Sequence, residues 1–499
     1  MTDYTEKPFA ASVVSSRPGS VFAPGERMAC RLHLAGRPGT TGEVAVSVED
    51  FFYRTVWRGE FAFTIDGGGQ ADIPLPLDRR LPRGVFVVRA DVALRDGFSD
   101  TIFSRIAIMP PLDNRHRNKA LTSVTLPKWP CREAIFERGR AMGIGSQTAI
   151  TRDFPEEEMD LMRRYGMESM GTAIMNDVSN GCIQVEGQRL VPGLLKLTHV
   201  TAEVEQAVEE ESYLKAKSLP WIDMWWFAGE SAPRYRAHGV KGASLVPHNI
   251  PDFAKLILAC RRGVKRANPQ ARFLAVGGPC NMSPGNGIDL LDRYVRALGT
   301  GVRFDGVGIH PYRALPENPD LDDDATVLRS MLAKHGWGEI PVYWNEGIYH
   351  HSYVIPAWGL NAHRGASKHC RIGPVSYHMG WGERICAAYY ARYWLVGLKH
   401  QEQVKCFDGH WALMFLDVDL APFAFQKIPN TLGRLLGNAS FRRDIRFAPQ
   451  VRGYVFEDER GRPVAALWSH RARVDRGDEP PPVALIRFAG AMPEFFDLM

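Results

Sequence analysis

The sequence has no long apolar run, no basic cluster and no regularly spaced cysteines. None of its apolar stretches approaches the roughly 20 residues that span a bilayer, so no membrane partner is expected. Lysine and arginine number 61 against 56 aspartates and glutamates, and no basic run is interleaved with aromatics, which argues against a nucleic-acid partner. The eight cysteines show no CxxC spacing, which argues against a zinc knuckle and against a small disulfide framework.

The opening residues, MTDYTEKPFAASVV, lack a basic segment followed by an apolar core, so no signal peptide is predicted. This predicts a cytoplasmic location for the chain as printed, or secretion if its N-terminus is incomplete. At 499 residues the chain is too long for one hydrophobic core, and two or three domains are expected. Its charged fraction of 23% is that of an ordinary globular protein.

Residues 1–112 alternate short apolar segments with glycine- and proline-rich turns. In residues 85–92 and 102–109 the apolar side chains recur at alternate positions, which is typical of a half-buried strand. Several such strands predict an immunoglobulin-like β-sandwich. Its expected role is to brace the next domain, with direct sugar binding as the less favoured alternative. A polar, proline-led segment at 110–117 marks the linker.

Residues 118–436 show strands alternating with helices, which predicts a parallel sheet. The number of these units favours a (β/α)8 TIM barrel. The pattern places the first strand at 142–148 and the second at 167–175. Only residues 176–220 then remain before the next predicted strand, which is short for a helix, a strand and another helix. The placement of elements in this interval stays open.

Residues 437–499 again show alternating runs between polar turns, and they predict a small β-sandwich beside the barrel. The last residues, 495–499, begin like a new strand and stop without a turn or a partner. This sandwich is therefore expected to be incomplete, with the native protein extending further. The predicted fold class is α/β: a TIM barrel flanked by an N-terminal immunoglobulin-like β-sandwich and a small C-terminal one.

Two hydrophobic, strand-like stretches each end in a lone glutamate. The stretch that begins at Trp221 ends at Glu230, and a predicted strand at 340–343 leads to Glu346. In α/β barrels the C-terminal ends of the strands carry the chemistry. Cleavage of a glycosidic bond with retention needs one carboxylic acid to protonate the leaving oxygen and one carboxylate to trap the anomeric carbon. The pair predicts a retaining glycoside hydrolase.

The neighbours of the two glutamates suggest separate roles. Apolar residues precede Glu230, and an apolar wall favours the raised pKa that a general acid requires. Asn345 and Tyr343 precede Glu346 and offer donors that hold a carboxylate ionised. The alternative for each glutamate is a solvated position in a surface loop.

These motifs resemble those of the clan A retaining glycoside hydrolases, whose acid/base and nucleophile are glutamates at the ends of barrel strands four and seven. The resemblance implies that Glu230 is the acid/base and Glu346 the nucleophile. The sequence His310-Pro311-Tyr312 resembles the sugar-facing His and Tyr that follow strand six in this clan. Trp411 resembles the aromatic floor of the −1 subsite.

The resemblance covers roughly residues 140–490 and has one departure. The family usually has Asn immediately before the acid/base glutamate, where it grips the sugar 2-hydroxyl, and this chain has Gly229. Another residue supplies that contact, or the substrate differs at C2, or catalysis is impaired.

Strand alternation places Trp226 and Trp344 on the same sides as the two glutamates, so both are expected to bind substrate together with Asn345.

Two other functions stay open. Gly229 suggests a non-catalytic carbohydrate-binding barrel. The long loop at 347–381, with five of the fifteen histidines and several aromatics, is expected to be a functional lid suited to carbohydrate, and a metal-dependent hydrolase is the rival interpretation of its histidines. No HxH or HExxH spacing supports a metal site there. The favoured interpretation is an enzyme with a carbohydrate partner, no cofactor and no metal. The sugar, its anomer, exo or endo action and the oligomeric state are not fixed by the sequence.

Overall fold

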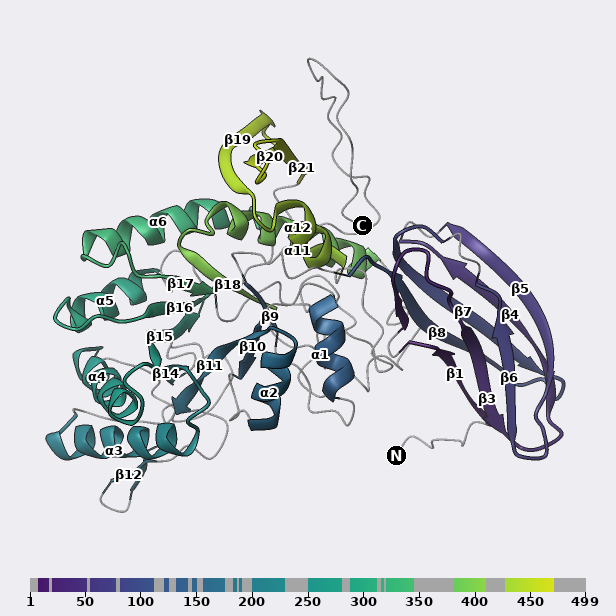
Figure 1. Ribbon diagram of the computed structural model, residues 1–499, viewed down its shortest axis with the longest axis horizontal. Helices are drawn as coiled ribbons and strands as arrows, with labels where there is room; N and C mark the ends of the chain where they lie inside the picture. The colour runs from purple at the N-terminus through teal and green to yellow at the C-terminus, as the bar shows by residue number, and fades with distance from the viewer. Residues whose placement is uncertain are drawn as a thin grey trace.

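The structure, a computed structural model, comprises three regions along the chain: two N-terminal sheets, a barrel with helices around it, and a small C-terminal sheet (Figure 1). It describes residues 8–17, 20–51, 54–77, 81–111, 121–124, 132–141, 146–149, 156–175, 183–185, 188–190, 200–228, 250–280, 288–311, 316–317, 320–344, 381–409 and 427–470.

The N-terminal region contains two sheets that share one hydrophobic cluster. Its strands are β1 (Phe9–Ser15), β2 (Val21–Phe22), β3 (Cys30–Gly36), β4 (Thr41–Glu49), β5 (Thr55–Thr64), β6 (Gln70–Leu75), β7 (Gly84–Leu94) and β8 (Ser99–Ile108). The sheets have the orders β1-β3-β6 and β2-β8-β7-β4-β5. In β4, Val44, Val46 and Val48 are buried while their neighbours are not, so alternation directs one face of the larger sheet into the shared cluster.

Eight parallel strands close on themselves to form the barrel. They are β9 (Leu121–Val124), β10 (Ser146–Ala149), β11 (Glu168–Met175), β14 (Met224–Ala228), β15 (Arg272–Cys280), β16 (Gly306–His310), β17 (Val342–Trp344) and β18 (Val404–Gly409). Each strand pairs with the next along the chain, and β18 pairs with β9. In chain order β14 is therefore the fourth barrel strand and β17 the seventh.

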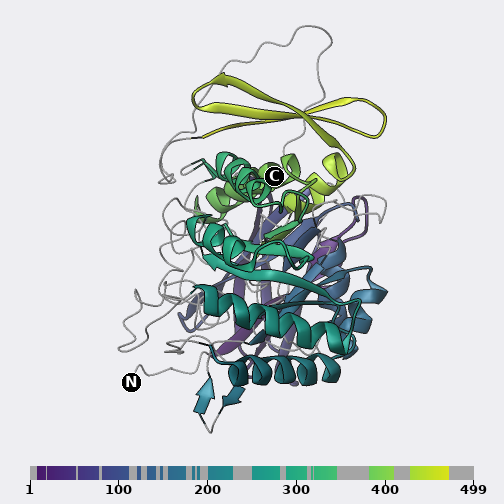
Figure 2. The ribbon, with the colours of Figure 1, turned by 90° about the vertical axis from the view of Figure 1, so that its left-hand side faces the viewer.

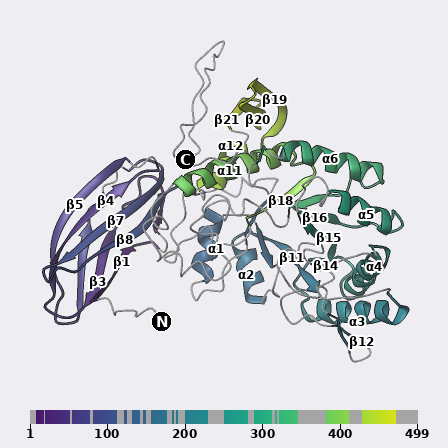
Figure 3. The same cartoon turned by 180° about the vertical axis from the view of Figure 1, so that it is seen from behind.

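Helices lie around the outside of these strands (Figures 1 and 3). They are α1 (Arg132–Ala141), α2 (Glu156–Arg164), α3 (Ala202–Ser218), α4 (Ile250–Ala267), α5 (Ile288–Leu298), α6 (Leu321–Lys334), α11 (Trp381–Lys399) and α12 (Lys427–Leu436), and a hairpin of β12 (Ile183–Val185) and β13 (Gln188–Leu190) precedes α3. In α5 the residues Leu291, Val295 and Leu298 recur at helical spacing and are buried. None of the helices that the structure describes has the length and apolar character of a membrane span.

The structure corrects the expected strand numbering at the start of the barrel. The first strand is β9, which was not predicted, because Leu121-Thr122-Ser123-Val124 is too short to show a period. The strand expected first, at 142–148, is the second (β10), and the one expected second, at 167–175, is the third (β11). Between the third strand and the fourth a barrel needs one helix, and α3 is the helix that the described residues of 176–220 contain.

The C-terminal sheet is antiparallel and lies beside α11 and α12 (Figure 2). Its strands are β19 (Ser440–Ala448), β20 (Val451–Glu457) and β21 (Pro463–Ser469). Within the described residues it is one sheet. The further strand expected from the sequence and the chain end at 495–499 both lie outside the described residues.

One hydrophobic cluster continues from the barrel into the N-terminal region. In β7, Val85 and Val87 belong to the barrel cluster, whereas Phe86 and Val88 belong to the N-terminal cluster. Both faces of this strand are therefore covered, which explains why consecutive residues are buried. The larger N-terminal sheet therefore contributes side chains to the barrel cluster.

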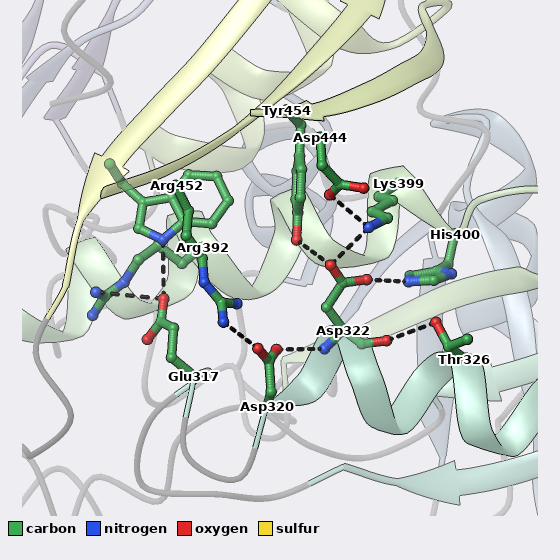
Figure 4. A network of polar contacts seen from close by, with 11 residues as sticks. Glu317, Asp320, Asp322, Thr326, Arg392, Lys399, His400, Asp444, Arg452 and Tyr454 are labelled. Carbon is green, nitrogen blue, oxygen red and sulfur yellow. Dashed lines mark hydrogen bonds and ion pairs between the residues drawn. The ribbon is translucent and has the colours of Figure 1, made fainter. Parts of the chain in front are cut away.

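A buried polar network joins the C-terminal sheet to α6 and α11 (Figure 4). Asp322 Oδ2 accepts hydrogen bonds from Lys399 Nζ at 2.7 Å and from the Tyr454 hydroxyl at 3.1 Å, and Oδ1 lies 2.7 Å from His400 Nε2. Burial raises the pKa of Asp322, but the hydrogen bonds and charges of His400 and Lys399 outweigh it and hold the pKa well below its usual value. The ionised carboxylate is the centre of this network.

Asp322→Asn is expected to lower the free energy of unfolding at pH 7 by about 3 kcal/mol, because Lys399 and His400 lose a buried counter-charge. Since folding lowers the pKa of Asp322, its stabilising contribution is complete above about pH 4 and is lost as the pH falls toward the folded-state pKa. Urea unfolding at pH 7 and pH 3 should show the difference between variant and parent shrinking at pH 3. The exposed Asp323 of the same helix is the control. An equal loss in Asp323→Asn would contradict the assignment.

Candidate active site

Two barrel strands lead directly to the predicted catalytic glutamates. The fourth strand, β14, ends at Ala228, two residues before Glu230. The seventh strand, β17, ends at Trp344, two residues before Glu346. Parallel strands of a barrel all end at the same rim, so both glutamates follow strands that arrive at one face of the molecule.

Glu230 and Glu346 themselves lie outside the described residues, and so does Gly229. Three of the predicted substrate-binding residues lie outside them as well: Tyr312, Asn345 and Trp411. His310 is the last residue of β16, where its backbone pairs in register with Cys280 of β15. The structure therefore describes the strands that approach the site and not its glutamates.

Strand register identifies the residues that face the barrel interior. Trp226 pairs with Leu274, and Leu274 with Gly306, so these positions share one face. A Cβ at Gly306 would lie 2.7 Å from Leu274 Cδ2 and 2.5 Å from Tyr343 Cε2. Gly306 therefore leaves the space in which the Tyr343 ring lies. Leu274, Trp226 and Tyr343 point into the barrel.

Two residues of β14 face the other way. The ring of Phe227 contacts that of Phe253 in α4, with ring centroids 5.3 Å apart, and Trp225 Nε1 donates to the Ile222 carbonyl at 3.2 Å. Both residues belong to the barrel cluster, which fills the space between the strands and the helices. They hold the fourth strand against the helical layer, and this leaves Trp226 directed inward.

Trp226 is fully buried, and its indole Nε1 finds no hydrogen-bond acceptor among the residues that the structure describes. Buried N–H groups normally have a partner. A partner for the Trp226 N–H would therefore have to come from outside the residues that the structure describes. That Trp226 binds substrate stays a prediction.

Trp344 does not share this environment, which corrects the expectation from alternation. It is fully buried, and its ring packs against Tyr393 of α11 with centroids 5.1 Å apart. Its register partners are Ile309 and Phe407, and Ile309 also belongs to the cluster between strands and helices. Trp344 therefore supports the seventh strand from outside and is not positioned to stack on a sugar. Tyr343, its neighbour, is the residue of β17 that faces the interior.

The part of the chain that the structure describes contains no group of three or more His, Cys, Asp or Glu side chains placed to hold a metal ion. The histidine-rich segment at 347–381 lies almost wholly outside the described residues. Of the cysteines, Cys260 is fully buried in α4, and burial raises the pKa of its thiol to about 12. This thiol is a packed core group and not a metal ligand.

Comparison with solved structures finds one that shares the fold of this chain and others of lower similarity. A family 39 glycoside hydrolase from the gut symbiont Bacteroides cellulosilyticus WH2 aligns with a TM-score of 0.61 and 14% identity, covering 92% of this chain and 90% of the other. A β-D-glucuronidase of Dictyoglomus thermophilum gives a TM-score of 0.38 at 12% identity over 85% of this chain and 68% of its own. A Bacteroides uniformis β-glucuronidase gives 0.38 at 10% identity over 92% and 60%.

The similarity to the family 39 glycoside hydrolase is a similarity of fold. The alignments with the two β-glucuronidases, at TM-scores of 0.38, say nothing about this chain. No protein-family model matches the sequence, and no curated protein matches it significantly.

Proposed function

We propose that this chain is a glycoside hydrolase that cleaves a glycosidic bond by a retaining double displacement. The observation that carries the proposal is the position of Glu230 and Glu346, which follow the fourth and seventh strands of a closed, eight-stranded parallel barrel. The proposed architecture is a (β/α)8 TIM barrel at 118–436 between an N-terminal immunoglobulin-like β-sandwich at 1–112 and a small C-terminal β-sandwich at 437–499. The fold shared with a family 39 glycoside hydrolase supports it.

In the proposed mechanism Glu346 attacks the anomeric carbon while Glu230 gives its proton to the leaving oxygen. The C–O bond to the leaving group breaks as the bond to the Glu346 carboxylate forms. Glu230, now ionised, removes a proton from water, and the water oxygen displaces Glu346 to give product with the original anomeric configuration. A retaining pair of this kind has its carboxyl groups about 5–5.5 Å apart.

The surroundings of β14 support a general acid at its end. Trp226 is buried on the inward face of this strand and is the apolar residue of β14 that leads toward Glu230 on that face. A carboxyl beside an apolar surface is poorly solvated when ionised, so its pKa rises and it keeps its proton at neutral pH. Trp226, on the inward face, is proposed to line the floor of the same subsite.

The alternation of side chains along β17 bears on the direction of Glu346. Tyr343 points inward and Trp344 outward, so regular alternation would direct position 345 inward and position 346 outward. The proposed nucleophile therefore requires the alternation to break after Trp344. The pairing of β17 with β18 is already irregular, with a register shift between Val342 and Tyr343.

The remaining proposed contacts lie at the rim. His310, Tyr312, Asn345 and Trp411 are proposed to bind a carbohydrate substrate, without metal or cofactor. With Gly229 in place of asparagine, recognition is expected to depend little on the sugar 2-hydroxyl.

Turnover of a panel of aryl glycosides, with and without a chelator, tests the proposal. We expect release of the phenol from at least one glycoside at a rate that the chelator does not change. Loss of turnover on chelation would favour a metal-dependent hydrolase. Sugar binding by calorimetry with no turnover would favour a carbohydrate-binding barrel.

The anomeric configuration of the first product is a separate prediction. If Glu230 and Glu346 form the pair, NMR of the freshly released sugar should show the configuration of the substrate, before mutarotation mixes the anomers. The uncatalysed mutarotation of the same sugar is the control. An inverted product would remove Glu346 from the role of nucleophile.

A further inference from the structure

The segment that joins β16 to α6 carries two acidic residues that are held by the C-terminal part of the chain (Figure 4). The first is Glu317, whose side chain is only 3% exposed. Its Oε1 accepts a hydrogen bond from Trp468 Nε1 of β21 at 3.0 Å and lies 3.6 Å from Arg392 Nη1 of α11. The carboxylate is thus enclosed between a helix of the barrel and a strand of the C-terminal sheet.

The second acidic residue is Asp320, the N-cap of α6. Its side chain accepts from the Asp322 backbone N–H at 3.1 Å, as N-cap residues do, and it forms an ion pair with Arg452 of β20. Glu317 and Asp320 also form a short antiparallel bridge with each other. The Leu321 N–H donates to the Pro316 carbonyl at 2.7 Å, which holds Pro316 close to the start of α6.

Arg392 contacts both the β16–α6 segment and the C-terminal sheet. Besides lying next to Glu317, its Nη1 donates to the Ser469 carbonyl of β21 at 3.3 Å, and its guanidinium lies 4.5 Å from the centroid of the Tyr389 ring. Its side chain is 5% exposed. One buried arginine of α11 therefore contacts both the β16–α6 segment and the C-terminal sheet.

The C-terminal sheet has a second attachment that does not involve this segment. Lys399 bridges Asp322 of α6 and Asp444 of β19, with both distances 2.7 Å, and its ammonium lies 5.1 Å from the ring centroids of Phe441 and Tyr454. These contacts alone would attach the C-terminal sheet to α6 and α11. Buried ion pairs add little net stability, because desolvation offsets their attraction, but they fix one geometry. The contacts to Glu317 and Asp320 thus point to control of conformation.

We propose that Arg452 and Trp468 are positioning residues for the segment 311–320, and that the C-terminal sheet is a brace for this loop of the active face. The segment begins directly after His310 and contains Tyr312, the two residues proposed to bind sugar after the sixth strand. It is a βα-loop, the kind of loop that forms the active face of a barrel. The part of this inference that concerns substrate rests on the proposed function; the part that concerns the loop does not.

The test uses two variants of the full chain that remove one contact each: Trp468→Phe, which keeps the ring beside Tyr454 but loses the donor to Glu317, and Arg452→Gln, which removes the ion pair with Asp320. Hydrogen exchange by mass spectrometry should show faster exchange, about tenfold, in peptides covering 311–320 and no change in peptides of β14 and β15. The matched control is Arg442→Gln, which breaks the exposed pair with Glu457 within the same sheet. It should leave the exchange of 311–320 unchanged.

The second measurement is the kinetics of the same variants on an aryl glycoside. We expect kcat/KM to fall about tenfold in Trp468→Phe and Arg452→Gln, with most of the change in KM, because a displaced binding loop weakens substrate contacts before it affects the reacting bonds. Unchanged exchange of 311–320 in both variants, or an equal increase in Arg442→Gln, would overturn the proposal. If the parent protein turns over no glycoside, the proposed function fails, and the exchange measurement still decides whether the sheet positions the loop.

Discussion

Replacing Glu346 with glycine is expected to abolish turnover of every glycoside, lowering kcat by at least about a thousandfold. The variant lacks the group that is proposed to form the bond to the anomeric carbon, and no leaving group is good enough to compensate for that loss. Added azide should restore turnover by entering the space of the lost side chain, and the product should be a glycosyl azide of inverted configuration. Steady-state kinetics with and without azide, followed by NMR of the product, provide the measurement.

The matched control is Glu339→Gly, which removes an exposed glutamate from the turn before β17. It should retain turnover close to that of the parent. Near-normal activity of Glu346→Gly would refute the assignment. In that case the chain would be an active enzyme with another nucleophile.

Glu230→Ala is expected to have an effect that depends on the leaving group. For glycosides with poor leaving groups kcat should fall by about 10²–10⁴-fold, the usual contribution of general acid–base catalysis. The first step with a dinitrophenyl leaving group needs no proton and should be nearly unaffected. A series of aryl glycosides of graded phenol pKa measures this dependence, which should be steep in the variant and shallow in the parent.

Azide distinguishes the two glutamates in the same experiment. In Glu230→Ala it should attack the glycosyl-enzyme intermediate and give a glycosyl azide of retained configuration, the opposite of the Glu346→Gly product. A uniform loss of activity across all leaving groups would mean that Glu230 is not the general acid. Trp226 would then serve only the packing of the barrel interior.

Local periodicity was sufficient for the elements with strong amphipathic patterns. The apolar spacing of residues 288–298 predicts a helix with the bounds that the structure gives to α5, because five buried residues recur on one face. In contrast, β9 has four residues and two hydroxyl side chains, so no period could identify it. Its identity depends on its two barrel neighbours, β10 and β18.

At the site, Trp226 faces the barrel interior and Trp344 faces the helices, and whether either lies on the side of its glutamate stays a prediction. The prediction for Trp344 assumed that the strand continues unchanged to Glu346, whereas β17 ends at Trp344. The Trp344 ring packs against Tyr393, a residue distant in sequence that no local pattern could indicate. The same limit applies to the contacts of Glu317. Its partners, Arg392 and Trp468, lie 75 and 151 positions further along the chain (392 − 317 and 468 − 317), and no local pattern links them.

The split of β7 between two hydrophobic clusters has a consequence for how the chain can be divided. The boundary near residue 112 marks a change of sequence pattern, but Val85, Val87, Ala107 and Met109 pack with the barrel across it. A fragment cut at that boundary would bring this apolar surface into contact with water on both pieces, and exposed apolar surface of this kind promotes aggregation. The two regions are therefore expected to melt together in one calorimetric transition, and an expression fragment limited to the barrel is expected to be insoluble. The smallest part of this chain that folds on its own is therefore expected to include both regions.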